Sequence, residues 1–172
     1  LTIGNDLNRD YETLISSWKE GFPSLKIVTS LPISSSKENI EIISGDWRTN
    51  LLTDKKMLEL IQNAMFIIIP IKQTMQPSGQ SVCLQAMACA KAVIMSNING
   101  LWDKDQLVTD KVIKLVPCRD PMQLSLCVEF FLSNLEYVNS LGREAKIMVN
   151  KNYSVEIMAK SLAHLLENEI KT

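Results

Sequence analysis

The chain has 172 residues, 46% of them hydrophobic, and a formal net charge of −1. This composition is ordinary for a soluble globular protein, and the near-neutral charge gives no electrostatic case for a nucleic-acid partner. The apolar runs are strand-sized and fall short of the ~18 residues that a membrane span needs, so we expect no transmembrane segment. The four cysteines lack a paired C-x-x-C spacing, which argues against a zinc site and favours reduced thiols in a cytosolic protein.

Short apolar runs alternate with helical patterns along the whole chain, and we expect residues 1–172 to form a single domain. Six strands are predicted, at residues 1–4, 25–30, 40–44, 65–70, 92–96 and 112–116. Helices are predicted within residues 9–24, 53–64 and 79–89, and residues 31–39 should form a polar loop. Three terminal helices should cover residues 121–133, 135–150 and 153–169. Gly21 with Pro23 should end the first helix as C-cap and stop, and Thr53 should cap the second.

This alternation predicts an α/β fold, a Rossmann-like open parallel sheet of about six strands with helices on both faces. The run "MFIIIP" at residues 65–70 is apolar throughout, as expected of a strand buried on both faces. The commonest strand order for such a fold is 3-2-1-4-5-6, in which the chain reverses direction between strands one and four. The loops 4–10 and 71–81 follow those two strands, so they should meet in a crevice where ligands bind.

The first loop, "GNDLNRDY", offers Gly4 for close backbone approach and Arg9 at a helix start. The helix dipole disfavours positive charge there, whereas a bound phosphate would make an arginine favourable. The alternative is a solvated Arg9 paired with Asp6 or Asp10. The loop does not carry the G-x-G-x-x-G fingerprint, so an ordinary dinucleotide site is not supported.

The second loop leads into a helix starting near Gly79, and Ser78, Gly79, Gln80 and Ser81 can present free backbone N–H groups to an anion. The alternative is that Ser78 merely caps this helix and Gly79 tightens the turn. Both loops converge on one crevice, which favours anion binding. Gln85, on the second turn, is a candidate ligand for sugar hydroxyls, or else a solvated polar residue.

Two further features carry less information. Gly100, Trp102 and Asp103 follow the fifth strand near the same rim, either as part of the site or as a packed turn. His164 is the only histidine and lies within the last predicted helix. Without a second histidine or a Cys–His or Ser–His–Asp set, metal and triad chemistry are unsupported, so we expect no metal and assign no catalytic residue.

At residues 81–101, "SVCLQAMACAKAVIMSNINGL" resembles the "LLEAMACGKPVIASDVGGL" region of group 1, family-4-type glycosyltransferases of the GT-B fold. Other parts of the chain are similar to further motifs of the C-terminal domain of these enzymes. They are "GNDLNRDYETLISSW" with the opening of that domain, "KKMLELIQNAMFIIIP" with "ELAELYRSADVFVLPS", and "REAKIMVNKNYSVEIMAKSLAHLL" with its end.

The resemblance implies the donor-binding half of a two-domain enzyme that moves a sugar from a nucleotide-sugar to a glycan or lipid-linked acceptor. The acceptor would bind an N-terminal domain absent from this chain, so we expect no transfer by this chain alone. The nucleotide-sugar would be a substrate, with no cofactor. The implied location is cytoplasmic, including the periphery of the inner membrane.

By position, the resemblance assigns the donor diphosphate to Gly4, Arg9 and the amides of Gly79, Gln80 and Ser81, with Ser78 beside them. Gln85 falls where the family has the glutamate that holds the ribose. The family's other glutamate falls at Pro77, which has no carboxylate, so retention or inversion is not implied. The chain therefore resembles a divergent subfamily. The alternatives are a non-catalytic nucleotide-binding or interaction domain and half of a nucleotide-sugar epimerase.

Overall fold

The computed structural model describes residues 1–44, 52–109 and 111–170 and confirms the predicted α/β fold. The strands in these ranges are β1 Thr2–Ile3, β2 Leu25–Thr29, β3 Ile40–Ser44, β4 Phe66–Ile69, β5 Ala92–Ser96 and β6 Lys114–Val116. The helices are α1 Tyr11–Ser17, α2 Asp54–Asn63, α3 Gln80–Ala88, α4 Lys104–Thr109, α5 Pro121–Ser133, α6 Leu135–Asn152 and α7 Val155–Ile170.

All strand pairs in the described ranges are parallel, but they form two three-stranded sheets rather than the single six-stranded sheet we expected. One sheet has the order β1-β2-β3 and the other β4-β5-β6. They meet at Leu1, whose nitrogen donates to the carbonyl oxygen of Phe66 (3.3 Å) and whose carbonyl oxygen accepts from the N–H of Ile68 (2.9 Å). The strand β1 has only two residues, too few to form a regular ladder with both neighbours.

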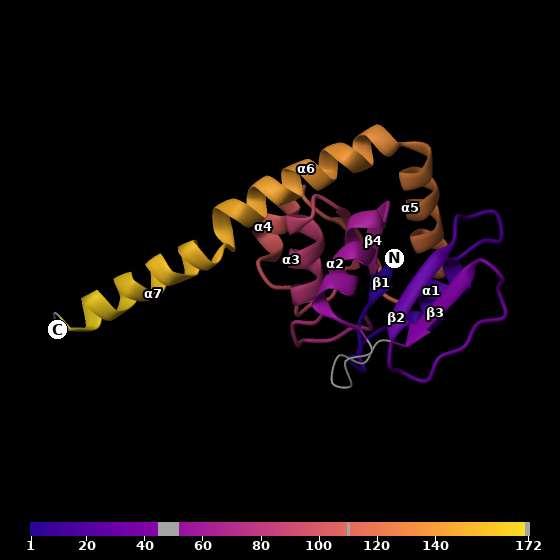
Figure 1. The fold of residues 1–172 in the computed structure, drawn as a ribbon, viewed down its shortest axis with the longest axis horizontal. Coiled ribbons are helices and arrows are strands. Elements are labelled where there is room, and N and C mark those ends of the chain that lie inside the picture. The colour runs from indigo at the N-terminus through magenta and orange to yellow at the C-terminus, as the bar shows by residue number, and fades with distance from the viewer. Residues whose placement is uncertain (45–51, 110, 171–172) are drawn as a thin grey trace.

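Helices cover the strands from both sides (Figure 1). Along β4, Ile67 and Ile69 belong to one apolar cluster with α2, α3 and α6, whereas Phe66 and Ile68 belong to a second cluster with α1 and α5. Side chains alternate between the faces of a strand, so β4 must be apolar at every position to fill both clusters. All four residues are buried, which confirms the prediction for this strand.

The first helix ends earlier than predicted, at Ser17 with Trp18 as C-cap, so the assignment of Gly21 as the C-cap was wrong. Lys37 explains the early end, because its Nζ donates to the carbonyl oxygens of Ile15 (2.7 Å) and Trp18 (2.6 Å). A distant lysine thus satisfies carbonyls that a longer helix would have bonded itself. The cap at Thr53 was predicted correctly, since its side chain accepts from the N–H of Lys56.

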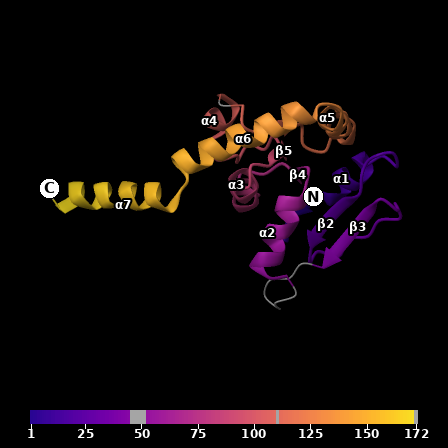
Figure 2. The ribbon, with the colours of Figure 1, turned by 45° about the horizontal axis from the view of Figure 1, so that its top comes forward.

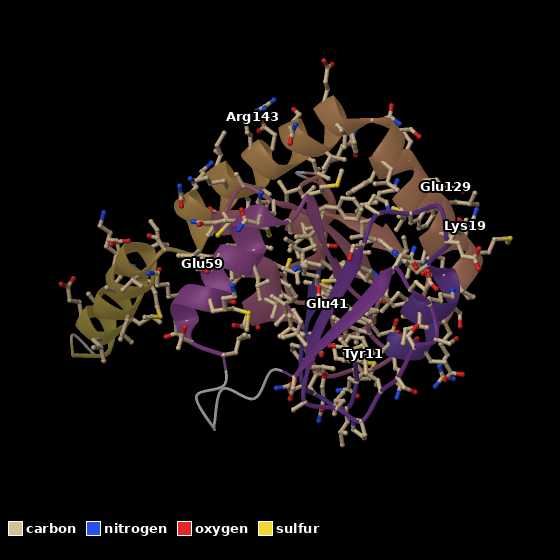
Figure 3. All side chains as sticks on the ribbon, turned by 45° about the vertical axis from the view of Figure 1, so that its right-hand side comes forward. Tyr11, Lys19, Glu41, Glu59, Glu129 and Arg143 are labelled. Carbon is tan, nitrogen blue, oxygen red and sulfur yellow. The ribbon has the colours of Figure 1, made fainter. Side chains whose placement is uncertain are left out.

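One ion pair and one close backbone approach help to place α5 and α6. The ammonium group of Lys19, just beyond α1, pairs with Glu129 of α5 at 2.5 Å (Figure 3). Gly142 lets α6 approach the turn before β5, since a Cβ there would lie 2.1 Å from the carbonyl oxygen of Ala90.

The last helix, α7, projects away from the body (Figures 1 and 2). None of the helices in the described ranges is long and apolar enough to cross a bilayer.

Two core thiols predict how stability depends on pH. Burial raises the pKa of Cys83 from 9.0 to about 12 and that of Cys127 to about 11. Above pH 9 the unfolded chain loses protons that the folded chain keeps, so the free energy of unfolding should fall as pH rises. Each thiol should contribute about 1.4 kcal/mol per pH unit until its folded pKa is reached. Urea denaturation between pH 7 and 10.5 measures this slope. The double variant Cys83→Ala/Cys127→Ala should show a weaker fall of the free energy of unfolding with pH. An unchanged slope would show that the two thiols do not cause this fall.

Candidate functional site

A cavity of about 620 Å³ opens between the end of β1, the first turn of α2 and the start of α3. Five of the residues predicted for the site line it, namely Gly4, Arg9, Gly79, Ser81 and Gln85. The topological prediction of a crevice after strands one and four is thus confirmed in its location. A cavity of about 440 Å³ at the amino ends of the strands is lined by none of these residues.

The two loops that border the cavity are tied together through their backbones. Arg9 and Ile71 form an antiparallel bridge. The N–H of Asp10 donates to the carbonyl oxygen of Pro70 at 3.1 Å, and that of Lys72 donates to the carbonyl oxygen of Asn8 at 2.8 Å. These bonds hold the segment after β1 against the segment after β4, so residues about seventy positions apart share one site.

Arg9 is buried beneath the first loop rather than solvated, since its side chain is only 2% exposed. A Cβ on Gly4 would lie 2.1 Å from Arg9 Nε, so only glycine leaves room for the guanidinium there. The Nε atom pairs with Asp6 Oδ2 at 2.9 Å. Neither Nε, whose contact with Asp6 is an ion pair without hydrogen-bond geometry, nor Nη1 has a hydrogen-bond partner among the described residues. A buried cationic nitrogen without a partner is costly, and an anionic ligand would satisfy it.

The start of α3 lies beside this nitrogen. Gly79 is the N-cap residue, with the left-handed backbone angles φ 75° and ψ 0°, and none of the described side chains caps the helix. A Cβ on Gly79 would lie 2.6 Å from Ile69 Cγ2 and 3.4 Å from Arg9 Nη1. The first four N–H groups of a helix have no partner within it and carry the positive end of the dipole. Arg9 and α3 therefore direct positive charge at the same place.

The first loop is held from below by Tyr11, the first residue of α1. Its hydroxyl donates to the carbonyl oxygen of Gly4 at 2.6 Å, and the residue is 3% exposed. Burial raises the pKa of Tyr11, while the positive charge of Arg9 opposes that rise. The phenol therefore stays protonated and continues to donate, fixing the loop that covers Arg9.

The other predicted residues lie around the cavity rather than in its lining. Ser78 is buried, and its hydroxyl donates to Asp6 Oδ1 at 2.9 Å instead of capping α3. The side chain of Gln80 is exposed. Gln85, one of the five lining residues, is also exposed; it lies four residues after Ser81, on the helical face that lines the cavity.

The turn after β5 is packed, as the alternative reading held. A Cβ on Gly100 would lie 2.4 Å from the carbonyl carbon of Met75. Asp103 accepts a hydrogen bond from the hydroxyl of Tyr153, at the end of α6. Trp102 is half-buried against the core. None of these residues lines the cavity.

Sequence reasoning did not identify several residues of the cavity. Asp6, considered only as a partner of a solvated Arg9, lines it together with Asn5. Asp54, the first residue of α2, brings a second carboxylate. Leu52 and Met57 supply an apolar wall. The predicted strand order could have identified the residues at the start of α2, because α2 begins at the same edge of the sheets as α3.

Several solved structures are similar to this one, and some of them are named as glycosyltransferases or glycosyltransferase domains. The sucrose-phosphate synthase of Thermosynechococcus elongatus has a TM-score of 0.75 at 20% identity, over 99% of this chain and 45% of that chain. Anabaena HepE, solved in complex with UDP-glucose, has a TM-score of 0.69 at 12% identity, over 97% of this chain and 48% of HepE. The C-terminal domain of the Francisella tularensis group 1 glycosyl transferase LpcC has a TM-score of 0.68 at 15% identity, over 90% and 85%.

No protein-family model matches the sequence, and no curated protein matches it. The chain spans about half the length of the synthase and of HepE, but most of the LpcC domain. At these identities the similarity establishes the fold. The resemblance found in the sequence is therefore confirmed at that level, and the chain has the fold of a GT-B glycosyltransferase C-terminal domain.

Proposed function

We propose that this chain is the nucleotide-sugar-binding half of a glycosyltransferase, and that its cavity holds the diphosphate of the donor. The observation that carries the proposal is the buried Nη1 of Arg9, unpartnered among the described residues, beside the uncapped start of α3. Two independent sources of positive potential converge on one point. A diphosphate offers several oxygens and can engage both at once.

The remaining parts of the cavity suit the rest of a nucleoside diphosphate. Gln85 lies one helical turn beyond Ser81 on the same face, so its amide can accept from one ribose hydroxyl and donate to the other. Anabaena HepE was solved with UDP-glucose and with UDP, which supports the same ligand class for this fold. The acceptor, a glycan or a lipid-linked sugar, would bind a second domain in the cytoplasm or at the inner membrane.

Binding measurements test this proposal directly. Isothermal titration of the chain with UDP, ADP and GDP should give dissociation constants at least tenfold lower than those of the matching nucleosides. The reason is that Arg9 and α3 address the phosphates alone. Pyrophosphate should compete with the best diphosphate. Equal affinities for nucleoside and diphosphate, or no binding of any of them, would refute the proposed function.

Gln85 gives a sharper prediction within the same site. Gln85→Ala should weaken the best nucleoside diphosphate by roughly 1 kcal/mol, the usual net worth of a hydrogen bond. Gln85→Glu should keep or improve the affinity, because a carboxylate accepts from both ribose hydroxyls. Pyrophosphate is the matched control, since it has no ribose and should bind all three proteins alike. If all three proteins bind the nucleoside diphosphate with the same affinity, Gln85 does not contact the ribose.

A further inference from the structure

One carboxylate joins the two loops of the cavity. Asp6 Oδ1 accepts from the Ser78 hydroxyl (2.9 Å) and from the N–H of Asn8 (3.2 Å). Its Oδ2 lies 2.9 Å from Arg9 Nε. Asp6 thus contacts both groups that flank the proposed phosphate position, while its own side chain is 41% exposed.

The bond to Ser78 controls the start of α3. A serine hydroxyl can bond the backbone N–H two residues further along the chain, which for Ser78 is that of Gln80, the first residue of α3. The hydroxyl of Ser78 donates to Asp6, and in this rotamer its oxygen accepts from no N–H of α3; none of the other described side chains caps the helix. The N–H groups of its first turn are thereby left for a ligand.

The ion pair controls the orientation of Arg9. Asp6 neutralises the guanidinium from its Nε side, which stabilises a charge that is otherwise buried. Nη1 is left without a partner among the described residues, 3.4 Å from where a Cβ on Gly79 would lie. A free arginine could turn its donors elsewhere, whereas this arginine is fixed with one nitrogen toward α3.

Resting on the proposed function, we propose that Asp6 is a positioning residue for diphosphate binding, which it promotes despite its own negative charge. Through Ser78 it keeps α3 uncapped, and through Arg9 Nε it directs Nη1 to the phosphates. Charge repulsion alone predicts the opposite, namely that Asp6 weakens binding, because a carboxylate in an anion site repels the ligand. The cavity contains a second carboxylate, Asp54, for which no such contacts exist among the described residues.

The two carboxylates therefore make a matched pair of variants. Asp6→Asn and Asp54→Asn remove the same charge from the same cavity. Asp6→Asn should weaken pyrophosphate at least tenfold, because an amide turns its NH₂ toward either Arg9 or Ser78. Asp54→Asn should bind pyrophosphate as tightly as the unmodified chain or more tightly. Tighter binding by both variants would overturn the proposal.

Ligand-free crystal structures separate this inference from the proposed function. In Asp6→Asn the guanidinium of Arg9 should turn away from position 6 and the Ser78 hydroxyl should turn to an N–H of α3. If both stay in place, Asp6 positions neither group and the inference fails, whatever the unmodified chain binds. If both move but the unmodified chain binds no pyrophosphate or nucleoside diphosphate, the proposed function fails and the role in ligand binding fails with it.

Discussion

Replacing Arg9 by glutamine is expected to weaken nucleoside diphosphate binding by about 10- to 100-fold, the loss of one or two charge-assisted hydrogen bonds. Its Nη1 is the buried donor next to α3, and glutamine is too short to reach the same point. The substitution also leaves Asp6 without its cation, so the carboxylate adds repulsion. The affinity of Arg9→Lys for the diphosphate should lie between those of the unmodified chain and Arg9→Gln, because lysine keeps the positive charge but lacks the several N–H donors of the guanidinium.

The control for charge is Arg119→Gln. Arg119 is exposed just after β6, at the same edge of the sheets, and does not line the cavity. Arg119→Gln removes the same charge as Arg9→Gln, so a general electrostatic effect would weaken diphosphate binding in both variants. Thermal unfolding should show that Arg9→Gln remains folded. If Arg9→Gln and Arg119→Gln bind the diphosphate as tightly as the unmodified chain, Arg9 does not contact the ligand.

A large loss of stability is expected for Gly79→Ala. Alanine at φ 75° costs about 1–2 kcal/mol, and its Cβ would lie 2.6 Å from a methyl of Ile69, which is fully buried. Overpacking at such a contact costs a further 1–3 kcal/mol. The melting temperature should fall by roughly 5–15 °C, as measured by circular dichroism.

Gly21→Ala is the matched control. No atom in the described part of the chain lies within 4 Å of a Cβ built on Gly21, and the backbone angles of Gly21 are not left-handed. Alanine there should leave the melting temperature nearly unchanged or raise it slightly, because it restricts the unfolded chain. A small effect at both glycines would show that the backbone before α3 adapts, and that the site is not rigid in the way the structure indicates.

The fold was largely predictable because its signals are local. The apolar run of β4 and the small residues of α3 specify a doubly buried strand and a closely packed helix without knowledge of distant contacts. The short helix α4 was missed, since six residues give too little periodicity. The end of α1 was missed because it depends on Lys37, some twenty positions away.

The site was predictable in its backbone and less so in its side chains. Strand order brings Gly4 and Gly79 to one edge whatever residues surround them. The dual contact of Asp6 depends on rotamers and on the pairing of two loops, neither of which a single sequence specifies. Pro77 shows a further limit, because it marks a departure from the family pattern without showing which group replaces the lost carboxylate.

The central claim is that the cavity holds a nucleoside diphosphate through Arg9 and the start of α3. A crystal structure of the chain with the best-binding nucleoside diphosphate at saturation tests it most directly. The predicted result places phosphate oxygens within hydrogen-bond distance of Arg9 Nη1 and of the N–H groups of Gly79–Ser81, with the ribose near Gln85. Phosphates bound elsewhere on the molecule, with Nη1 still lacking a partner, would contradict it.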